Sequence, residues 1–131
     1  MIGSRAVVED EAIATVLRLY TEGAANGDTA KLREAFHEHA RTYGSLNGTR
    51  YDISVAEMIA MEEHSPRNSD GRYTAHIMSI DQVGDVATAT VEEDGCWGTV
   101  SFTSFLSLVK FDNRWQIVAR VFSHVSGVLP S

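Results

Sequence analysis

A long apolar hairpin near the C-terminus constrains this chain more than any other segment. Residues 99–122 predict two β-strands joined by a short turn at residues 112–114. One face of the hairpin carries Val100, Phe102, Leu106 and Leu108, and the other carries Phe105, Val109 and Phe111. A hairpin that is apolar on both faces needs two covers, because a soluble monomer rarely leaves so large a patch bare. We expect the chain's own helices to cover one face, and a second sheet or subunit to cover the other.

Length and composition predict one folded domain, spanning residues 1–131. The chain is 44 % hydrophobic and 22 % charged, which is ordinary globular composition, and it is long enough to bury a sizeable core. The formal net charge is −7, with only 11 Lys and Arg, and these are scattered. This balance argues against nucleic acid and against an anionic membrane surface as partners.

Cysteine usage and hydropathy predict a cytoplasmic protein. Cys96 is the single cysteine, so an internal disulfide is excluded and a reducing compartment is favoured. The first residues lack the apolar run of a secretory signal. No stretch approaches the roughly 20 apolar residues of a membrane span.

Three amphipathic segments in the first half of the chain predict three helices. The first covers residues 9–25, where apolar side chains recur with helical spacing. The second follows Asp28, which is suited to cap it, and its buried side is expected to hold Leu32, Ala35 and Phe36. The third begins at Ser54, where Ser-x-x-Glu predicts a capping box, and it ends before Pro66.

The remaining segments predict strands. Short extended segments are expected over residues 41–53 around an Asn-Gly turn, followed by strands at about 72–83, 86–93, 96–110 and 114–125. The short turns between neighbouring strands imply antiparallel pairing. The predicted fold class is therefore α+β, with three N-terminal helices packed on a curved, mostly antiparallel sheet.

Several local motifs, in this order and spacing, resemble the NTF2-like superfamily, which includes SnoaL-like and ketosteroid isomerase-like proteins. The chain is most similar to the small bacterial group labelled "putative lumazine-binding". The matching motifs are Leu-Tyr-x7-Asp (19–28), Lys-Leu-Arg-x-x-Phe-His (31–37), Ala-Arg-x-Tyr-Gly (40–44), Ile-x-Ser-Ile-Asp-x-Val-Gly-Asp (77–85) and Phe-Thr-x-Phe-Leu-Ser-Leu-x-Lys…Arg-Trp-x-Ile-Val (102–118). The resemblance runs from about residue 10 to residue 125.

This resemblance implies a cone-shaped fold with a cavity between the helices and the concave face of the sheet. It also implies a homodimer formed through the convex face. By comparison with isomerase-like members, the cavity floor is expected to comprise Phe105, Ser107, Val109 and Phe111. The face that meets the second subunit is expected to comprise Phe102, Leu106, Leu108, Val118 and Phe122. Members range from isomerases, dehydratases and cyclases to binding modules, so the fold alone does not name a reaction.

The acids of the best-known chemistries are missing at the matching positions. Isomerase-like members imply a role for Tyr20, but Gly44 stands where they carry the general base, and Ser107 falls near their second acid. Dehydratase-like members pair a helix aspartate with a strand histidine, and here Ala25 stands at the helix position while His76 matches the histidine. These gaps favour binding over catalysis.

His76 is the strongest single candidate for chemistry. It is expected to share a strand face with Met78 and Ile80 and so to point into an apolar cavity. Desolvation would favour the neutral imidazole there, as a base or a hydrogen-bond donor. The alternative is a core histidine satisfied by a backbone carbonyl.

Further side chains are candidate ligand contacts. Met58, Met61 and His64 recur every three residues and could line a cavity mouth, or they could pack the core and end the helix. Trp97 could be a stacking wall for a flat ligand, or a packing residue. The predicted binding set is Tyr20, Tyr43, Met58, Met61, His64, His76, Met78, Trp97, Phe105 and Ser107.

No metal or cofactor is expected. His37 and His39 lie two apart and lack a completing ligand set, so they predict a solvated helix end. The acidic run at residues 92–94 predicts a solvated strand end, and Cys96 has no basic neighbour in sequence to activate it.

Three functions remain open from the sequence. The chain could bind a small apolar or aromatic ligand in the cone. It could be a cofactor-independent lyase, isomerase or cyclase that uses His76 with Tyr20 or Tyr43. It could also be a purely structural or interaction dimer.

Overall fold

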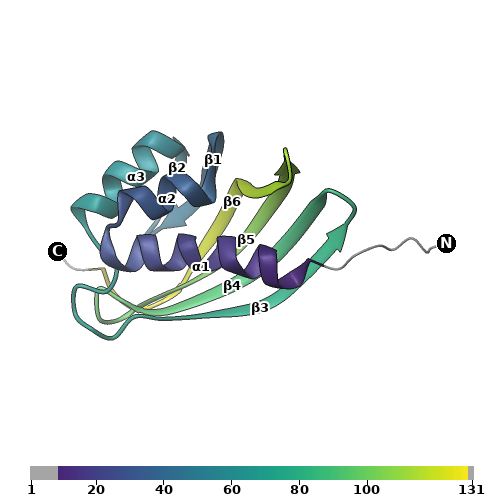
Figure 1. Cartoon of the computed structure of the whole chain (residues 1–131). Coiled ribbons are helices and arrows are strands. Elements are labelled where there is room, and N and C mark those ends of the chain that lie inside the picture. The colour runs from purple at the N-terminus through teal and green to yellow at the C-terminus, as the bar shows by residue number, and fades with distance from the viewer. Residues whose placement is uncertain (1–8, 130–131) are drawn as a thin grey trace.

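Three helices lie on one side of a curved six-stranded sheet (Figure 1). The computed structural model describes residues 9–129. The elements are α1 (Asp10–Asn26), α2 (Thr29–Ala35), β1 (Phe36–Leu46), β2 (Thr49–Ser54), α3 (Val55–His64), β3 (Thr74–Val83), β4 (Val86–Cys96), β5 (Val100–Phe111) and β6 (Arg114–Ser126). The α+β class predicted from the sequence is confirmed.

The strand order across the sheet is β2-β1-β6-β5-β4-β3. Every neighbouring pair is antiparallel except β1 and β6, which run parallel. The last two strands of the chain therefore occupy the middle of the sheet. The α1 helix lies against β3 and β6, whereas α3 lies against β1 and β2.

The end of α1 and the starts of α2 and α3 carry the local signals expected of helix boundaries. Gly27 ends α1 in the left-handed conformation with φ of 66°, and Asp28 caps α2 by accepting a hydrogen bond from the Lys31 N–H at 3.2 Å. Ser54 and Glu57 form the predicted capping box at α3. These local interactions fix the residues at which α1 ends and at which α2 and α3 begin.

The segment after α2 corrects one prediction. Phe36 is buried as expected, but it begins β1, so His37 and His39 lie on a strand rather than at a helix end. Pairing of Phe36 with Ile117 of β6 extends the strand back to this point. His37 packs against Phe111, with ring centroids 4.9 Å apart, while His39 is exposed.

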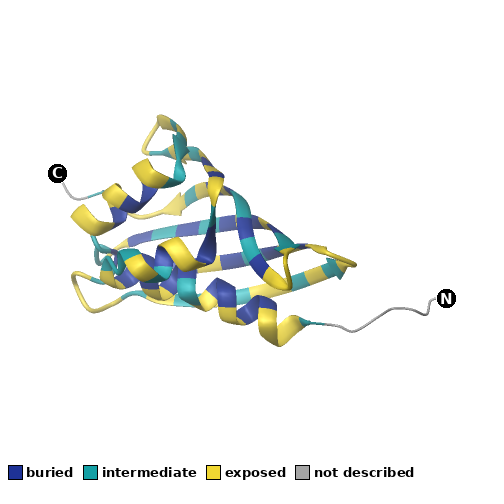
Figure 2. Ribbon diagram, turned by 45° about the horizontal axis from the view of Figure 1, so that its top comes forward, coloured by how far each residue is buried: buried dark blue, intermediate teal, exposed yellow. Residues whose placement is uncertain are grey.

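The two faces of the sheet are the reverse of the prediction. The face of β5 that meets the helices carries Phe102, Ser104, Leu106 and Leu108, all buried. Phe105 is 61 % exposed, and Ser107 and Phe111 are also exposed on the opposite, outer face. Figure 2 shows this alternation of buried and exposed residues along the strands. The predicted cavity floor is thus the outer face, because a strand assigned to the wrong side inverts every side chain together.

Two β-bulges, one in β6 and one in β3, shift the alternation of inward and outward side chains. In β6, Leu108 of β5 pairs with Ile117 while Ser107 pairs with Ala119, which leaves Val118 as the extra residue. In β3, the register shifts between Ile77 and Ser79, which leaves Met78 unpaired. Odd-numbered residues face the helices before each bulge, and even-numbered residues face them after it.

Within residues 9–129, no helix has both the length and the apolar character needed to cross a membrane.

Candidate functional site

A pocket of about 510 Å³ opens between α3, the residues after it, and the inner face of β1, β5 and β6. Most of its wall is apolar, from Leu46, Tyr51, Ile53, Met58, Met61, Trp97, Phe102, Phe122 and Leu129. The polar wall comprises Thr42, Glu62, His64, Ser65, Arg67 and Arg120. This size and lining are typical of small-molecule sites, which have a largely apolar wall and a few polar groups.

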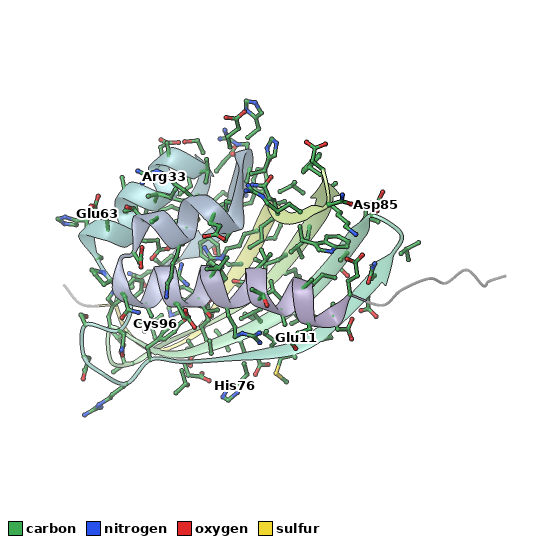
Figure 3. The ribbon with its side chains drawn as sticks, in the orientation of Figure 1. Glu11, Arg33, Glu63, His76, Asp85 and Cys96 are labelled. Carbon is green, nitrogen blue, oxygen red and sulfur yellow. The ribbon has the colours of Figure 1, made fainter. Side chains whose placement is uncertain are left out.

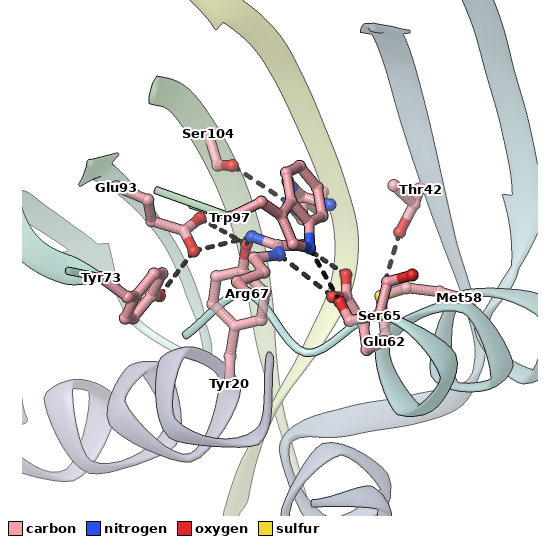
Figure 4. A network of polar contacts seen from close by, with 11 residues as sticks. Tyr20, Thr42, Met58, Glu62, Ser65, Arg67, Tyr73, Glu93, Trp97 and Ser104 are labelled. Atoms are coloured by element: carbon pink, nitrogen blue, oxygen red, sulfur yellow. Dashed lines mark hydrogen bonds and ion pairs between the residues drawn. The ribbon is translucent and has the colours of Figure 1, made fainter. Parts of the chain in front are cut away.

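A buried polar network forms one side of the pocket (Figure 4). Arg67, which follows α3, lies between two carboxylates: its Nε and Nη2 donate to Glu62, and its Nη1 donates to Glu93 at 2.7 Å. Glu93 on β4 also accepts hydrogen bonds from the hydroxyl of Tyr20 at 2.7 Å and from that of Tyr73 at 2.6 Å. Glu93 is fully buried, which corrects the prediction of a solvated strand end.

Charge and hydrogen bonding set the protonation states of this network. Burial raises the pKa of Glu93, but Arg67, Arg120 and the two tyrosine hydroxyls outweigh it and hold the pKa below its ordinary value. Burial raises the pKa of Tyr20 far above its ordinary value, against the opposing charges of Arg120 and Arg67. The phenol therefore stays protonated and donates to the Glu93 carboxylate, which suits a structural role better than that of a base.

Arg120 on β6 also lines the pocket, but its surroundings differ from those of Arg67. It is 3 % exposed, and its Nε donates to the Ser104 hydroxyl at 3.0 Å. The guanidinium lies over the Phe122 ring, 4.4 Å from the ring centroid, and 5.5 Å from that of Tyr20. Unlike Arg67, it forms no ion pair with a carboxylate among residues 9–129.

A tight turn after β4 holds Trp97 against the pocket. Trp97 has a positive φ of 52°, and Gly95 and Gly98 on either side also have positive φ. The Trp97 backbone N–H donates to the Arg67 carbonyl at 2.8 Å, and its indole N–H donates to the Ser65 carbonyl at 3.1 Å. Both hydrogen bonds tie the indole to the segment that carries Arg67, so Trp97 is a fixed wall.

The structure brings together four of the ten predicted binding residues. Met58, Met61, His64 and Trp97 all line the pocket. Tyr20 is fully buried beside it and belongs to the polar network. The side chains of Tyr43, Met78, Phe105 and Ser107 are exposed and do not line the pocket.

His76 also lies outside the pocket, which corrects the prediction that it points into a cavity. Its side chain is exposed and points away from the helices (Figure 3). The bulge at Met78 is the reason, because Ile77 and Ile80 take the positions that face the core. His76 and Tyr20 are therefore not adjacent partners in one site, and a reaction that uses both has no support in this geometry.

Gly44 shows why no general base stands where isomerase-like members carry one. A Cβ at this position would lie 2.5 Å from the Phe122 ring and 2.5 Å from the Phe122 carbonyl oxygen. The Phe122 ring therefore fills the space that a side chain at position 44 would need. The pocket has an aromatic wall in place of a carboxylate.

Sequence reasoning missed Glu62, Glu93, Arg67 and Arg120. Strand alternation could have found Glu93, since it lies two residues from the buried Val91. Arg120 was hidden by the bulge at Val118, because alternation from Trp115 and Ile117 would send it outward. Arg67 lies in a segment whose loop-like composition gave no sign of burial.

Helices packed on a curved sheet, with a pocket between them, define an NTF2-like protein. An NTF2-like protein of unknown function from Silicibacter pomeroyi is similar in structure, with a TM-score of 0.81 and 25 % identity, covering 91 % of this chain and 100 % of that one. An NTF2-like protein of unknown function from Methylobacillus flagellatus has a TM-score of 0.81 and 27 % identity, covering 93 % and 97 %. The predicted superfamily is confirmed.

The chain belongs to the family described as "Putative lumazine-binding", whose model matches residues 8–123. A curated relative, "Aldolase FrzH" from Cladobotryum sp, is 26 % identical over 114 residues, covering 87 % of this chain and 90 % of the relative.

Proposed function

We propose that this protein binds a small, largely apolar, aromatic molecule in the pocket beneath α3. The observation that carries the proposal is the pocket itself, with a volume of about 510 Å³ and an aromatic and aliphatic wall. Trp97, Phe102 and Phe122 offer faces and edges to a flat ring, and their centroids lie 5.6–5.9 Å apart in edge-to-face pairs. Met58 and Met61 add adaptable apolar contacts. The family's name is consistent with a flat heterocyclic ligand.

Calorimetric titration with naphthamide, a neutral flat probe, tests this proposal. We expect saturable binding that weakens at least tenfold in Leu46→Trp, because the indole would fill the pocket from the end of β1. Val83→Trp is the matched control, since Val83 is 78 % exposed at the β3–β4 turn and outside the pocket. Absence of binding to the wild-type protein, or equal binding by both variants, would contradict the proposal.

A second candidate function is catalysis of an aldol reaction. Two observations favour it: the similarity to a relative named as an aldolase, and the position of His64 in the pocket wall. In an aldol cleavage, a base takes the hydroxyl proton, the Cα–Cβ bond breaks, and an aldehyde and an enolate result. The enolate is then protonated to the ketone. The exposed imidazole of His64 could accept and return this proton.

A naphthyl β-hydroxyketone, whose cleavage releases a fluorescent aldehyde, tests the aldol candidate. We expect release faster than in buffer, and a loss of that rate in His64→Gln. The control His39→Gln alters an exposed histidine outside the pocket. Release no faster than in buffer would exclude this candidate for such substrates and leave the binding proposal standing.

We also propose a homodimer formed through the outer face of the sheet. Tyr43, Val121 and Phe105 are register partners on β1, β6 and β5, and are 41 %, 47 % and 61 % exposed. Such a row of uncharged side chains suits a two-fold contact between identical copies, where each row covers the other. The cytoplasmic location expected from the sequence stays a prediction.

A further inference from the structure

Arg120 is a buried guanidinium with an unfilled hydrogen-bonding capacity. A guanidinium carries five N–H donors, and the Ser104 hydroxyl accepts one of them, from Nε. Among residues 9–129, neither Nη of Arg120 has a hydrogen-bond or ion-pair partner. Arg67, in the same wall, instead engages two carboxylates. A charged group taken from water and left without an acceptor is costly, so the open side of Arg120 requires explanation.

The open side of this guanidinium belongs to the pocket. Arg120 lines the cavity while its residue surface is only 3 % exposed. In the described part of the chain, the side-chain nitrogen that is both unpartnered and wholly enclosed is Trp115 Nε1, so the Nη atoms of Arg120 retain access to the cavity space. Phe122 below the plane, and Ser104 at Nε, hold the orientation of the group.

The nearby carboxylates accept no hydrogen bond from Arg120. Glu62 is engaged by the Nε and Nη2 of Arg67. Glu93 accepts hydrogen bonds from Arg67, Tyr20 and Tyr73, and none from Arg120. The charge of Arg120 lowers the pKa of Glu93, but its Nη N–H groups have no acceptor among the described residues.

We propose that Arg120 binds an anionic oxygen group, in the simplest case a carboxylate, on the aromatic ligand of this pocket; this rests on the binding function proposed above. A carboxylate accepts two parallel N–H bonds from a guanidinium edge, and such pairs strengthen where water is excluded. The aromatic body of the ligand lies against Trp97 and Phe102, and its acidic group meets Arg120. The ligand class is therefore a flat aromatic acid, or a carbonyl compound that presents an enolate oxygen.

A pair of probes with one shape and two charges tests the proposal. Naphthoate and naphthamide are titrated calorimetrically into the wild-type protein, Arg120→Gln and the control Arg50→Gln, whose residue is exposed on β2. We expect the wild-type protein and Arg50→Gln to bind naphthoate at least tenfold more tightly than naphthamide. In Arg120→Gln this preference should vanish, because the affinity for naphthoate should fall by a larger factor than the affinity for naphthamide.

The outcomes separate the two proposals. Binding of both probes with equal affinity by the wild-type protein would overturn the role of Arg120 and leave the binding function intact. Failure to bind either probe would contradict the binding function itself. If Arg120→Gln does not fold, the nitrogen NMR signals of the Arg120 guanidinium in the wild-type protein provide the decision. Naphthoate should shift these signals further than naphthamide does; equal shifts by the two probes, or an unchanged guanidinium at saturating naphthoate, would overturn the proposal.

Discussion

Arg67 holds the buried charges of this protein in balance. It lies between Glu62 and Glu93, and all three side chains are almost fully enclosed. A buried ion pair contributes little compared with an apolar replacement of the whole cluster, yet removing one partner leaves charges without compensation. Replacing the whole network with apolar residues should therefore cost little stability, whereas replacing one of its charged residues should cost much more.

Replacing Arg67 with methionine should destabilise the protein by about 3–5 kcal/mol, because two carboxylates would lose their buried counterion. Urea unfolding followed by circular dichroism measures the change. The matched control is Arg18→Met, whose ion pair with Glu11 is exposed and should contribute little. A loss in Arg67→Met no larger than in Arg18→Met would contradict the role assigned to this residue.

The stability should depend on pH through Glu93. Its folded-state pKa lies below the ordinary value of 4.5, so its ionised form contributes stability that is complete above that value and is lost as the pH falls through the lower folded value. We expect Glu93→Gln to be less stable than wild type at neutral pH, and the difference to shrink below about pH 4.5. Unfolding midpoints across this range measure it, with the exposed Glu92→Gln as control. A difference that does not depend on pH would contradict the linkage.

At the scale of the elements, β1 and β6 come close together at Gly44 and Phe122, and this contact shapes the pocket wall. Gly44 pairs with Phe122, and the Phe122 ring and carbonyl occupy the position of a Cβ at residue 44. Since part of the obstruction is backbone, rotation of the ring alone cannot relieve it.

Gly44→Ala should therefore destabilise the protein and weaken naphthamide binding, because β1 and β6 must separate or Phe122 must move into the pocket. Thermal unfolding and the titration described above measure the two effects. Gly48→Ala is the control for a glycine at a turn with open space around it, although its positive φ gives it a modest cost of its own. Unchanged stability and binding in Gly44→Ala would show that the strands accommodate a methyl group.

The elements were predictable from local signals, whereas the side chains of the site were not. The capping box at Ser54, the stop at Gly27 and the period of two after residue 72 all act over a few residues, and the helices and strands follow them. The orientation of β3 and β6 depends on bulges at Met78 and Val118, which arise from pairing with neighbouring strands. That is why His76 was expected in the cavity and Arg120 was not anticipated there.

At the scale of the whole molecule, the outer face of the sheet carries large hydrophobic side chains that are exposed in the described chain, among them Phe105, Val121 and Tyr43. Phe105 lies at its centre, between Val121 on β6 and Thr90 on β4. The apolar hairpin predicts a second cover for this face, and the second copy proposed above would provide it.

Phe105→Glu should convert the proposed dimer to a 14.4 kDa monomer, because two carboxylates would face each other across the contact. Light scattering at micromolar concentration measures the mass. Val83→Glu, at an exposed turn, should leave the dimer intact. A wild-type protein that already scatters as a monomer would contradict the dimer proposal.

The parallel pairing of β1 with β6 has a consequence for how this chain folds during synthesis. β1 gains its neighbour β6 only after β6 has been synthesised, and the register partners, such as Phe36 and Ile117, are far apart in the sequence. Contacts of such long range slow folding, because the loop between them must close before they form. On the ribosome, the three helices and the strands β1 to β4 emerge before the middle of the sheet exists. We expect the apolar sides of these elements to stay incompletely covered until residues 114–126 can pair with them.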